Sequence, residues 1–331
     1  PASPSIGDTV AIVDFGSAST NNITINRNGS NIEGSATNDL FTSNNQSEIL
    51  VYSDGTRGWV KQTSTSDLPT FIQATGGTES TSGNYKIHTF NSSSNFVVSD
   101  LGNQPFKKVD YLVVAGGGGG GFGRAGGGGA GGARESKDSN INSPHTASPI
   151  AATTGITVTA QTYPITVGGG GAGRETTTGF GTKGSNSVFA TITSAGGGGG
   201  VGENNPMGPD ANGGSGGGGV RDGSCGTVGG TGNTPPVSPA QGTNGGASYP
   251  STGAGGGGGG ASAAGSASTP SGTGGSGGTG GVGITTHISG SPTVYAGGGG
   301  GGNSDGAPNG NLPNPGPGGG GSGGSGVSPG T

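Results

Sequence analysis

The sequence has little charge, few aromatic side chains and one cysteine. Charged residues make up 9% of the 331 residues and aromatic residues 5%, and the net charge is −5. No basic cluster is present, so binding to nucleic acid or to anionic membranes is not indicated. The longest apolar stretches, such as 111–115, fall far short of the roughly 20 residues that span a bilayer. The single Cys225 excludes an intramolecular disulfide framework and is interpreted as a free thiol, with an intermolecular bridge or a reactive thiol as alternatives.

The residue sets that enzymes and metal sites need are also lacking. The three histidines, His88, His145 and His287, are far apart in the sequence and have no carboxylate or thiol at ligand spacing. No Gly-Lys-Ser/Thr closes a phosphate loop, and no Ser, Asp and His set or carboxylate pair has a recognisable spacing. We therefore expect no enzyme activity, no metal and no cofactor, and we interpret His88 as a strand histidine with a local polar contact. A chain that begins at Pro1 without Met is expected to be a processed product or a fragment.

What the sequence has instead is glycine, and it is unevenly spread. Of the 87 glycines only ten precede Val109. The sequence therefore predicts three parts: a β-rich module at 1–66, a small β module at 67–108 and a glycine domain at 109–331. The fold class that we expect is mainly β modules followed by packed polyglycine helices with short covering strands, with essentially no α-helix.

Short apolar alternations predict strands in the first part. Val10, Ile12 and Phe15 begin one strand, and Ile23 and Ile25 precede a turn at Asn28-Gly29. Another strand covers 49–52 and is followed by a hairpin signal at Asp54-Gly55, with Trp59 as an anchor. Each strand is too short and polar to bury much surface, so association of identical chains is expected to supply the missing burial.

The second part has a similar pattern. Tyr85, Ile87 and Phe90 predict one strand, and the run 96–98 predicts its neighbour.

The glycine runs themselves are predicted to be ordered. A helix is excluded because each Gly costs about 1 kcal/mol relative to Ala, and collagen needs Gly only at every third position. The runs follow similar leading segments, "LVVAGGGGGG", "YPITVGGGGAG", "TITSAGGGGG" and "PTVYAGGGGGG", whereas a flexible tether needs no such register. We expect polyproline-II-like glycine helices of three residues per turn whose N–H and C=O groups pair between neighbouring runs. The glycines taken to represent this scaffold are Gly116, Gly118, Gly168, Gly197, Gly257 and Gly299.

The polar segments between the runs then become loops on a rigid frame, where function commonly lies. They carry the few large residues of this domain, which either pin the loops to the frame or form a binding tip. The candidate receptor-binding residues are Asn204, Asn205, Pro206, Met207, Asp210, Pro235, Tyr249, Asn309, Leu312, Asn314 and His145. If the runs that begin near Gly116, Gly196 and Gly297 share a direction, the loops "VGENNPMGPDAN" and "NSDGAPNGNLPNPGP" lie together at one end.

Several motifs together resemble a known family. "VDYLVVAGGGGGG", "YPITVGGGGAG", "GSNSVFATITSAGGGGG" and "SPTVYAGGGGGGNSDG" resemble the glycine-rich, polyglycine-II sandwich domains of tailed-phage tail fibres, especially those of T4-like and marine phages. "ITINRNGSNIEG" and "VYSDGTRGWV" similarly resemble β-rich stem modules of such fibres. The chain departs from the family after its last glycine run, where "GGSGGSGVSPGT" has no hydrophobic closing strand of the kind that many such domains have. Either this strand is absent or the chain is cut short.

The resemblance implies a tail-fibre adhesin of a bacteriophage virion. Its loops would bind a bacterial surface receptor, either an outer-membrane protein or a glycan, and its N-terminal region would form a homotrimer attached to other tail-fibre or baseplate proteins. Two other functions stay open. Some small ice-binding proteins also resemble packed polyglycine helices, although they have a regular Gly-x-x period, and a purely structural fibre protein would tolerate exchange of its loops.

Overall fold

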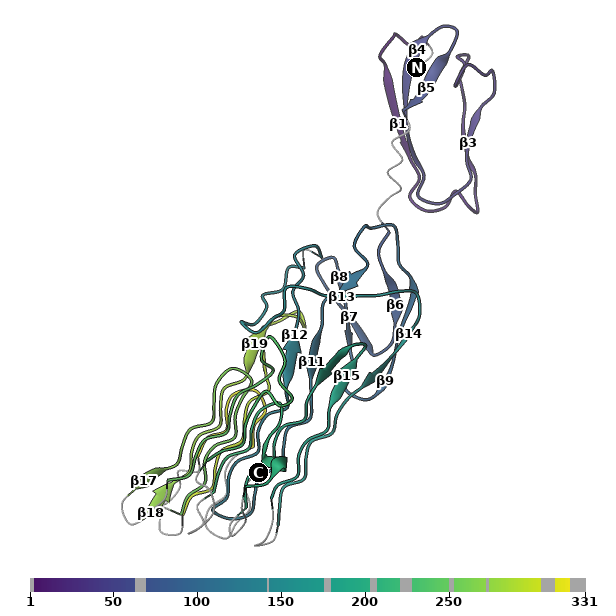
Figure 1. Ribbon diagram of the computed structural model, residues 1–331. Coiled ribbons are helices and arrows are strands. Elements are labelled where there is room, and N and C mark those ends of the chain that lie inside the picture. Colours follow the sequence, from purple (N-terminus) through teal and green to yellow (C-terminus); the bar gives the residue numbers. More distant parts are fainter. Residues whose placement is uncertain are drawn as a thin grey trace. The chain divides into compact units, whose positions relative to one another are not determined.

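The computed structural model in Figure 1 describes residues 3–62, 70–141, 143–175, 180–202, 207–220, 228–249, 253–271, 274–304 and 313–321. The chain divides into two compact units, Pro1–Gln73 with Asp100–Pro105, and Ala74–Ser99 with Phe106–Thr331. In the described ranges the regular structure is β-strand, apart from one 3-10 turn at Pro209–Ala211. The predicted class, mainly β without α-helix, is therefore confirmed. None of these ranges contains a helix with the length and apolarity that crossing a membrane requires.

The first unit is a small β module. Strands β1 (Thr9–Val13), β4 (Ser47–Asp54) and β5 (Gly58–Gln62) form an antiparallel sheet, and β2 (Ile23–Ile25) pairs with β3 (Asp39–Phe41). Ile32, Leu50 and Trp59 form the centre of its core. The β4–β5 hairpin and the anchoring role of Trp59 were both predicted from the sequence and are confirmed.

Two details of this module differ from the predicted strands. Phe15 lies beyond the end of β1 and is 93% exposed. Asn28 and Gly29 do form a turn, with φ angles of 45° and 87°, a left-handed conformation that these residue types adopt readily. This turn lies within a longer connection, because β2 pairs with residues 39–41.

The second unit begins with strands at one end of the glycine domain. Its main sheet has the order β16-β15-β14-β9-β6, formed by β6 (Gln73–Thr75), β9 (Ser94–Asp100), β14 (Thr162–Thr166), β15 (Ser187–Phe189) and β16 (Ile192–Ser194). The two-stranded pairs around it are β7 (Thr78–Ser82) with β8 (Tyr85–Thr89), β10 (Lys108–Val109) with β13 (Ile156–Thr157), β11 (Leu112–Val114) with β12 (Ala133–Glu135), β17 (Thr269–Ser271) with β18 (Gly274–Ser276), and β19 (Ile284–Thr286) with β20 (Thr293–Tyr295).

The predicted boundary at Val109 is not where the structure divides. Strand β9 pairs with β14, so that Phe96 lies opposite Tyr163, and Phe96 also contacts Phe189 edge to face at a centroid distance of 5.9 Å. Residues 74–99 are therefore part of the glycine-domain unit rather than a separate module. The two predicted strands of this segment both form, but β8 pairs with β7 and not with β9. His88 has the expected local contact, from Nδ1 to the carbonyl oxygen of Gly76 at 2.8 Å.

Beyond the strands the glycine runs lie side by side in the second unit (Figure 1), and the run 255–261 shows their packing most completely. Along this run, every third N–H group donates to the same neighbouring segment, with N···O distances of 2.8–2.9 Å. The run therefore donates to three different segments: 296–302, 216–219 and 263–266. Its carbonyl groups accept from three others, 127–130, 243–246 and 278–281. A repeat of three and pairing in every direction around the axis are the features of packed polyglycine II helices.

The closeness of the runs explains why they are glycine. A Cβ added to Gly198 would lie 1.9 Å from the carbonyl oxygen of Ala211, and one added to Gly258 would lie 2.0 Å from that of Gly128. Five of the predicted scaffold positions are equally tight, with nearest backbone oxygens at 2.0–2.1 Å: Gly116, Gly118, Gly168, Gly197 and Gly257. The sixth, Gly299, is looser, because its nearest backbone oxygen, that of Gly128, would lie 3.3 Å from the added Cβ.

Candidate functional site

The direction of the runs sorts the loops into two groups. Gly197 and Gly200 donate their N–H groups to the carbonyls of Gly116 and Gly119, so the runs 116–121 and 195–201 are parallel. Both the run 116–121 and the run 296–302 are antiparallel to residues 125–132. The three runs therefore share a direction, which is the condition that brings their following loops to one end. We call the end at which they finish the loop end, and the end that carries β11, β16 and β20 the strand end.

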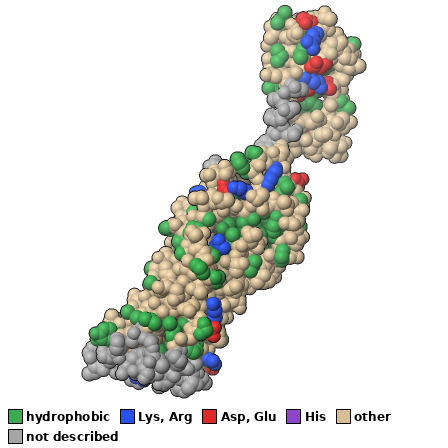
Figure 2. Space-filling view, in the orientation of Figure 1, with side chains coloured by type: hydrophobic (Ala, Val, Ile, Leu, Met, Phe, Trp, Pro, Cys, Tyr) green, Lys and Arg blue, Asp and Glu red, His purple; other side chains and the backbone are tan. Residues whose placement is uncertain are grey.

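The loop end is organised by a small apolar cluster. Val201, Ala211 and Val220 are at most 1% exposed, and the partly buried Phe180 and Met207 pack against them. The β17–β18 hairpin lies at the same end, where the N–H of Ser304 donates to the carbonyl of Gly275. Figure 2 shows hydrophobic side chains on the surface at this end of the unit.

The candidate residues do not all lie at the loop end. Asn204, Asn205, Pro206, Asn309 and Leu312 are outside the described residues, as is Cys225. Met207 and Asp210 lie at the loop end, where Asp210 is exposed and its carbonyl accepts from the N–H of Gly199 at 2.9 Å.

Tyr249 and Asn314 are also solvent-accessible. Tyr249 is 47% exposed, and its N–H donates to the Oγ of Ser268, just before β17. Asn314 is exposed on the flank of the stack, where its carbonyl accepts from Gly280 at 3.0 Å.

Pro235 and His145 belong to the strand end instead. The carbonyl of Pro235 accepts from the side chain of Gln241, whose Oε1 in turn accepts from Ala195 directly after β16. His145 is only 8% exposed, so its side chain presents almost no surface to a partner. Its burial agrees with the alternative interpretation that large loop residues pin the loops to the frame.

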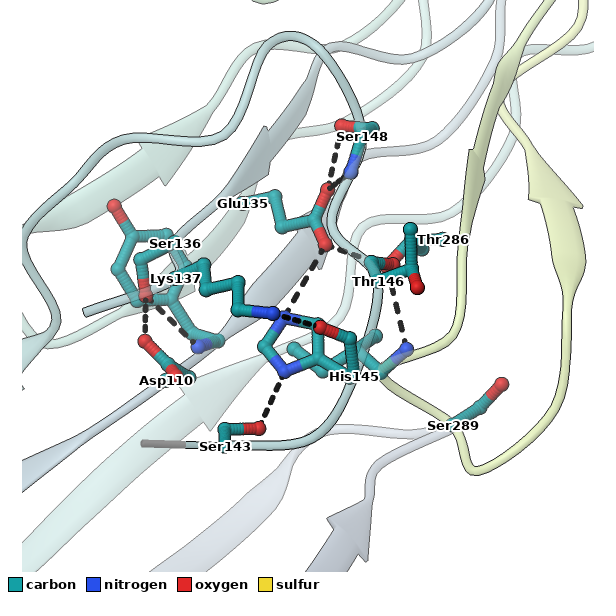
Figure 3. Close-up of polar contacts among 12 residues, drawn as sticks. Asp110, Glu135, Ser136, Lys137, Ser143, His145, Thr146, Ser148, Thr286 and Ser289 are labelled. Carbon is teal, nitrogen blue, oxygen red and sulfur yellow. Dashed lines mark hydrogen bonds and ion pairs between the residues drawn. The ribbon is translucent and has the colours of Figure 1, made fainter. Parts of the chain in front are cut away.

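His145 is part of a buried polar cluster at the strand end (Figure 3). Glu135 of β12 is 1% exposed. Its Oε2 accepts from the N–H and Oγ of Ser148 at 3.0 and 2.5 Å, and its Oε1 accepts from Thr286 of β19 at 2.5 Å. One carboxylate therefore joins β12, β19 and the connection from β12 to β13 that contains Ser148, and hydrogen bonds to a charged group are the stronger kind.

The imidazole of His145 makes one hydrogen bond, between Nδ1 and the Oγ of Ser143 at 2.5 Å. Its Nε2 lies 3.7 Å from Oε1 of Glu135 and has no hydrogen-bond partner among the described residues. Burial lowers the pKa of His145, because desolvation disfavours the charged imidazolium. The Nζ of Lys137 also donates a hydrogen bond to the backbone carbonyl of His145.

A second carboxylate nearby is held in its charged form. Asp138 is 1% exposed, and it accepts from the Nζ of Lys108 at 2.7 Å and from the N–H groups of Asn140 and Gly155 at 2.9 and 3.0 Å. These bonds, led by that from Lys108, hold the pKa of Asp138 well below its usual range. Asp110 differs, because burial raises its pKa.

The row of Ser143, His145 and Glu135 has the residue types of a hydrolytic triad. Two cavities lie at the strand end, one of about 10 Å³ and one of about 400 Å³, and neither is lined by Ser143 or His145. The described residues also contain no group of three or more His, Cys, Asp or Glu side chains that could hold a metal ion. The hydrogen bonds of the cluster hold the segment 143–152 against β12 and β19.

Sequence reasoning missed this cluster and the larger cavity. The signal for the cluster was present in "ARESKD", four charged residues within five positions of a domain with few charges. Opposite charges so close together in a segment of small residues can pair with one another or with neighbouring segments, and buried charged side chains are usually paired.

Comparison with known proteins places the chain in one family. The family model for a glycine-rich domain matches residues 102–331. The comparison with curated proteins gave no match, and neither did the comparison with solved structures. The matched residues make up more than half of the chain and coincide with the polyglycine stack. The chain therefore belongs to the glycine-rich domain family.

Proposed function

We propose that the protein is an adhesin of a bacteriophage tail fibre, and that the loop end of its glycine stack binds a receptor on the bacterial surface. The observation that carries the proposal is the asymmetry of the stack. Runs that share a direction bring their following loops to one end, where the short β17–β18 hairpin also lies, while the main sheet and the strands that lead into the runs lie at the other. A rigid frame with variable loops at one end is a common arrangement for recognition.

The described residues of the loop end support a binding role. Val228 and Tyr249 are 53% and 47% exposed, so this end presents an apolar and an aromatic side chain to solvent. Apolar and aromatic side chains on a fixed frame lose little conformational entropy on binding, which favours affinity. The cluster of Val201, Ala211 and Val220 would hold the bases of these loops in place.

The first unit would serve as the trimerisation and attachment module. It buries few large apolar side chains, while Ile6, Val13 and Leu40 are 79%, 45% and 44% exposed. A unit of this size is marginal as a monomer, and identical chains could cover these side chains. Sedimentation equilibrium of the full chain tests this, and a monomer at all concentrations would contradict it.

The adhesin proposal is tested with the full chain, because a fragment that begins at Val109 would lose β9 from the main sheet. Fluorescently labelled protein is incubated with a panel of bacteria. One variant has residues 203–206 and 305–312 replaced by Gly-Ser segments of equal length, and a control variant has the same exchange at 235–239 of the strand end. Circular dichroism checks the fold of each.

We expect saturable binding to a narrow subset of bacteria that is lost only in the loop-end variant. Unchanged binding by that variant would contradict the assigned site. Binding to no bacterium, combined with thermal hysteresis of the same sample, would favour ice binding instead, and neither property would favour a structural fibre protein.

A further inference from the structure

The larger cavity at the strand end is a second candidate binding site, separate from the loop end. It has a volume of about 400 Å³ and lies between residues 154–161, which include β13, and the β15–β16 turn at 190–192. Small-ligand sites commonly have volumes of about 300–1,000 Å³. The residues that line it are all in the described part of the chain.

One lining residue is Tyr111, a tyrosine whose side chain is mostly buried. Tyr111 is 7% exposed, and the hydrogen bonds of this residue involve its backbone N–H and C=O groups. Its phenol hydroxyl is not one of the fully buried side-chain atoms that lack a partner, so it is open to the solvent of the groove. A ligand can replace water at such a hydroxyl if it reproduces the hydrogen bonds. The groove therefore contains a donor and acceptor that a ligand can satisfy.

The other lining residues define the chemistry of that ligand. Thr157, Thr159, Gln161 and Thr191 offer hydroxyl and amide groups, and Ile192 adds an apolar surface. None of the residues that line the groove is charged. A charged ligand would lose its hydration here without gaining a counter-ion, which is unfavourable.

Tyr163 gives the groove a fixed wall. It is 7% exposed, and its phenol oxygen accepts from the N–H of Thr159 at 2.8 Å and lies 3.2 Å from the Oγ1 of the same residue. These bonds tie the segment 159–163 together, and the side chain of Gln161 also bonds to the Tyr163 hydroxyl. A preformed wall lowers the entropy cost of binding.

We propose that this groove binds a neutral saccharide, a ligand that combines many hydroxyl groups with apolar ring faces and carries no charge. The hydroxyl of Tyr111 bonds one sugar hydroxyl at the base of the groove. Thr157, Gln161 and Thr191 bond others at its rim, and Ile192 covers a ring face. The site does not depend on the loops at the other end of the stack.

The test is a titration of the full-length protein with a panel of neutral disaccharides built from glucose, galactose, mannose and N-acetylglucosamine, and with sialylated and sulfated counterparts. Saturation-transfer NMR detects complexes with dissociation constants of up to about 10 mM, so it also reports weak binding. Thr157→Trp fills the groove from an exposed position. Thr193→Trp is the matched control, because Thr193 is an exposed threonine of β16 outside the groove.

We expect at least one neutral saccharide to bind, with binding abolished by Thr157→Trp and unchanged by Thr193→Trp. Tyr111→Phe, which removes only the hydroxyl, should weaken binding about 2- to 10-fold, the effect of one hydrogen bond. Tyr295→Phe serves as its control, since Tyr295 packs in the core around Ile284.

Three outcomes would overturn the proposal. These are no binding of any neutral saccharide, preferred binding of the charged counterparts, or binding that Thr157→Trp leaves intact. The last would place the saccharide elsewhere, and repeating the titration with the loop-end variant would show whether it binds there. Loss of bacterial binding without loss of saccharide binding would separate the two sites.

Discussion

Replacing Gly258 by alanine puts a methyl group where the backbone of a neighbouring run lies. The added Cβ would be 2.0 Å from the carbonyl oxygen of Gly128 and 2.5 Å from its carbonyl carbon. Because both atoms belong to a backbone that is itself bonded on other sides, neither can move without displacing a further run. At Gly169, by contrast, a Cβ would meet nothing within 4 Å, so this position is a matched control in the same scaffold.

The expected magnitudes follow from the contacts. Overpacking costs about 1–3 kcal/mol. Moving the run also strains the bonds from Gly258 to Gly299 and from Gly281 to Gly258, of 2.8 and 2.9 Å, each worth about 0.5–1.5 kcal/mol. Gly258→Ala should therefore lower the free energy of unfolding by about 2–6 kcal/mol. Gly169→Ala should leave it unchanged or raise it by about 0.4–1 kcal/mol, because alanine restricts the unfolded chain.

Thermal unfolding followed by circular dichroism distinguishes these values. For a domain of this size each 1 kcal/mol shifts the Tm by about 2–4 °C, so Gly258→Ala should lower the Tm by at least about 4 °C. Denaturant titration provides the free energies directly. Equal melting temperatures for the two variants would refute the reasoning, because the packing would then tolerate a side chain where the backbones are closest.

Three further predictions concern the backbone bonds and the strand-end cluster. The amide hydrogens of residues 256–260 should exchange slowly with solvent in an NMR experiment and those of Gly170 and Gly173 rapidly, because only the former have partners among the described residues; similar rates would contradict the stack. Asp138→Asn should destabilise the protein at pH 7 by about 1.5–3 kcal/mol, the value of a hydrogen bond to a charged group, because the Lys108 side chain is 22% exposed and the pair is only partly buried. The folded state holds the pKa of Asp138 well below its usual value. In urea titrations, the difference in unfolding free energy between this variant and the unchanged protein should therefore persist at pH 5 and shrink only as the pH falls below about 4. A difference already lost at pH 5 would contradict the lowered pKa. Burial lowers the pKa of His145. The stability that the neutral imidazole of His145 contributes should therefore be lost as the pH falls below the unfolded-state pKa of about 6.5. Between pH 7 and pH 5, the His145→Gln variant should lose less stability than the unchanged protein.

The fold class could be predicted from the sequence because it rests on local chemistry. Contiguous glycines exclude a helix and a collagen repeat, and they leave an extended glycine helix whose backbone groups must pair with neighbours. The β4–β5 hairpin and Trp59 as an anchor followed from turn residues and side-chain size. Both features depend on residues that are close in sequence, whereas the common direction of the three runs depends on hydrogen bonds between distant segments.

Which segments become neighbours was decided only by the tertiary structure. Glycine has no side chain that distinguishes one run from another, so nothing local specifies that 255–261 pairs with 216–219 or 278–281. The neighbours of each run are selected by the connections between runs and by the packing of the whole stack. For the same reason the pairing of β9 with β14, the position of His145 and Pro235 at the strand end, and the groove beside Tyr111 could not be read from the sequence. The sequence determined that backbones must pack against one another, and the three-dimensional arrangement determined which ones.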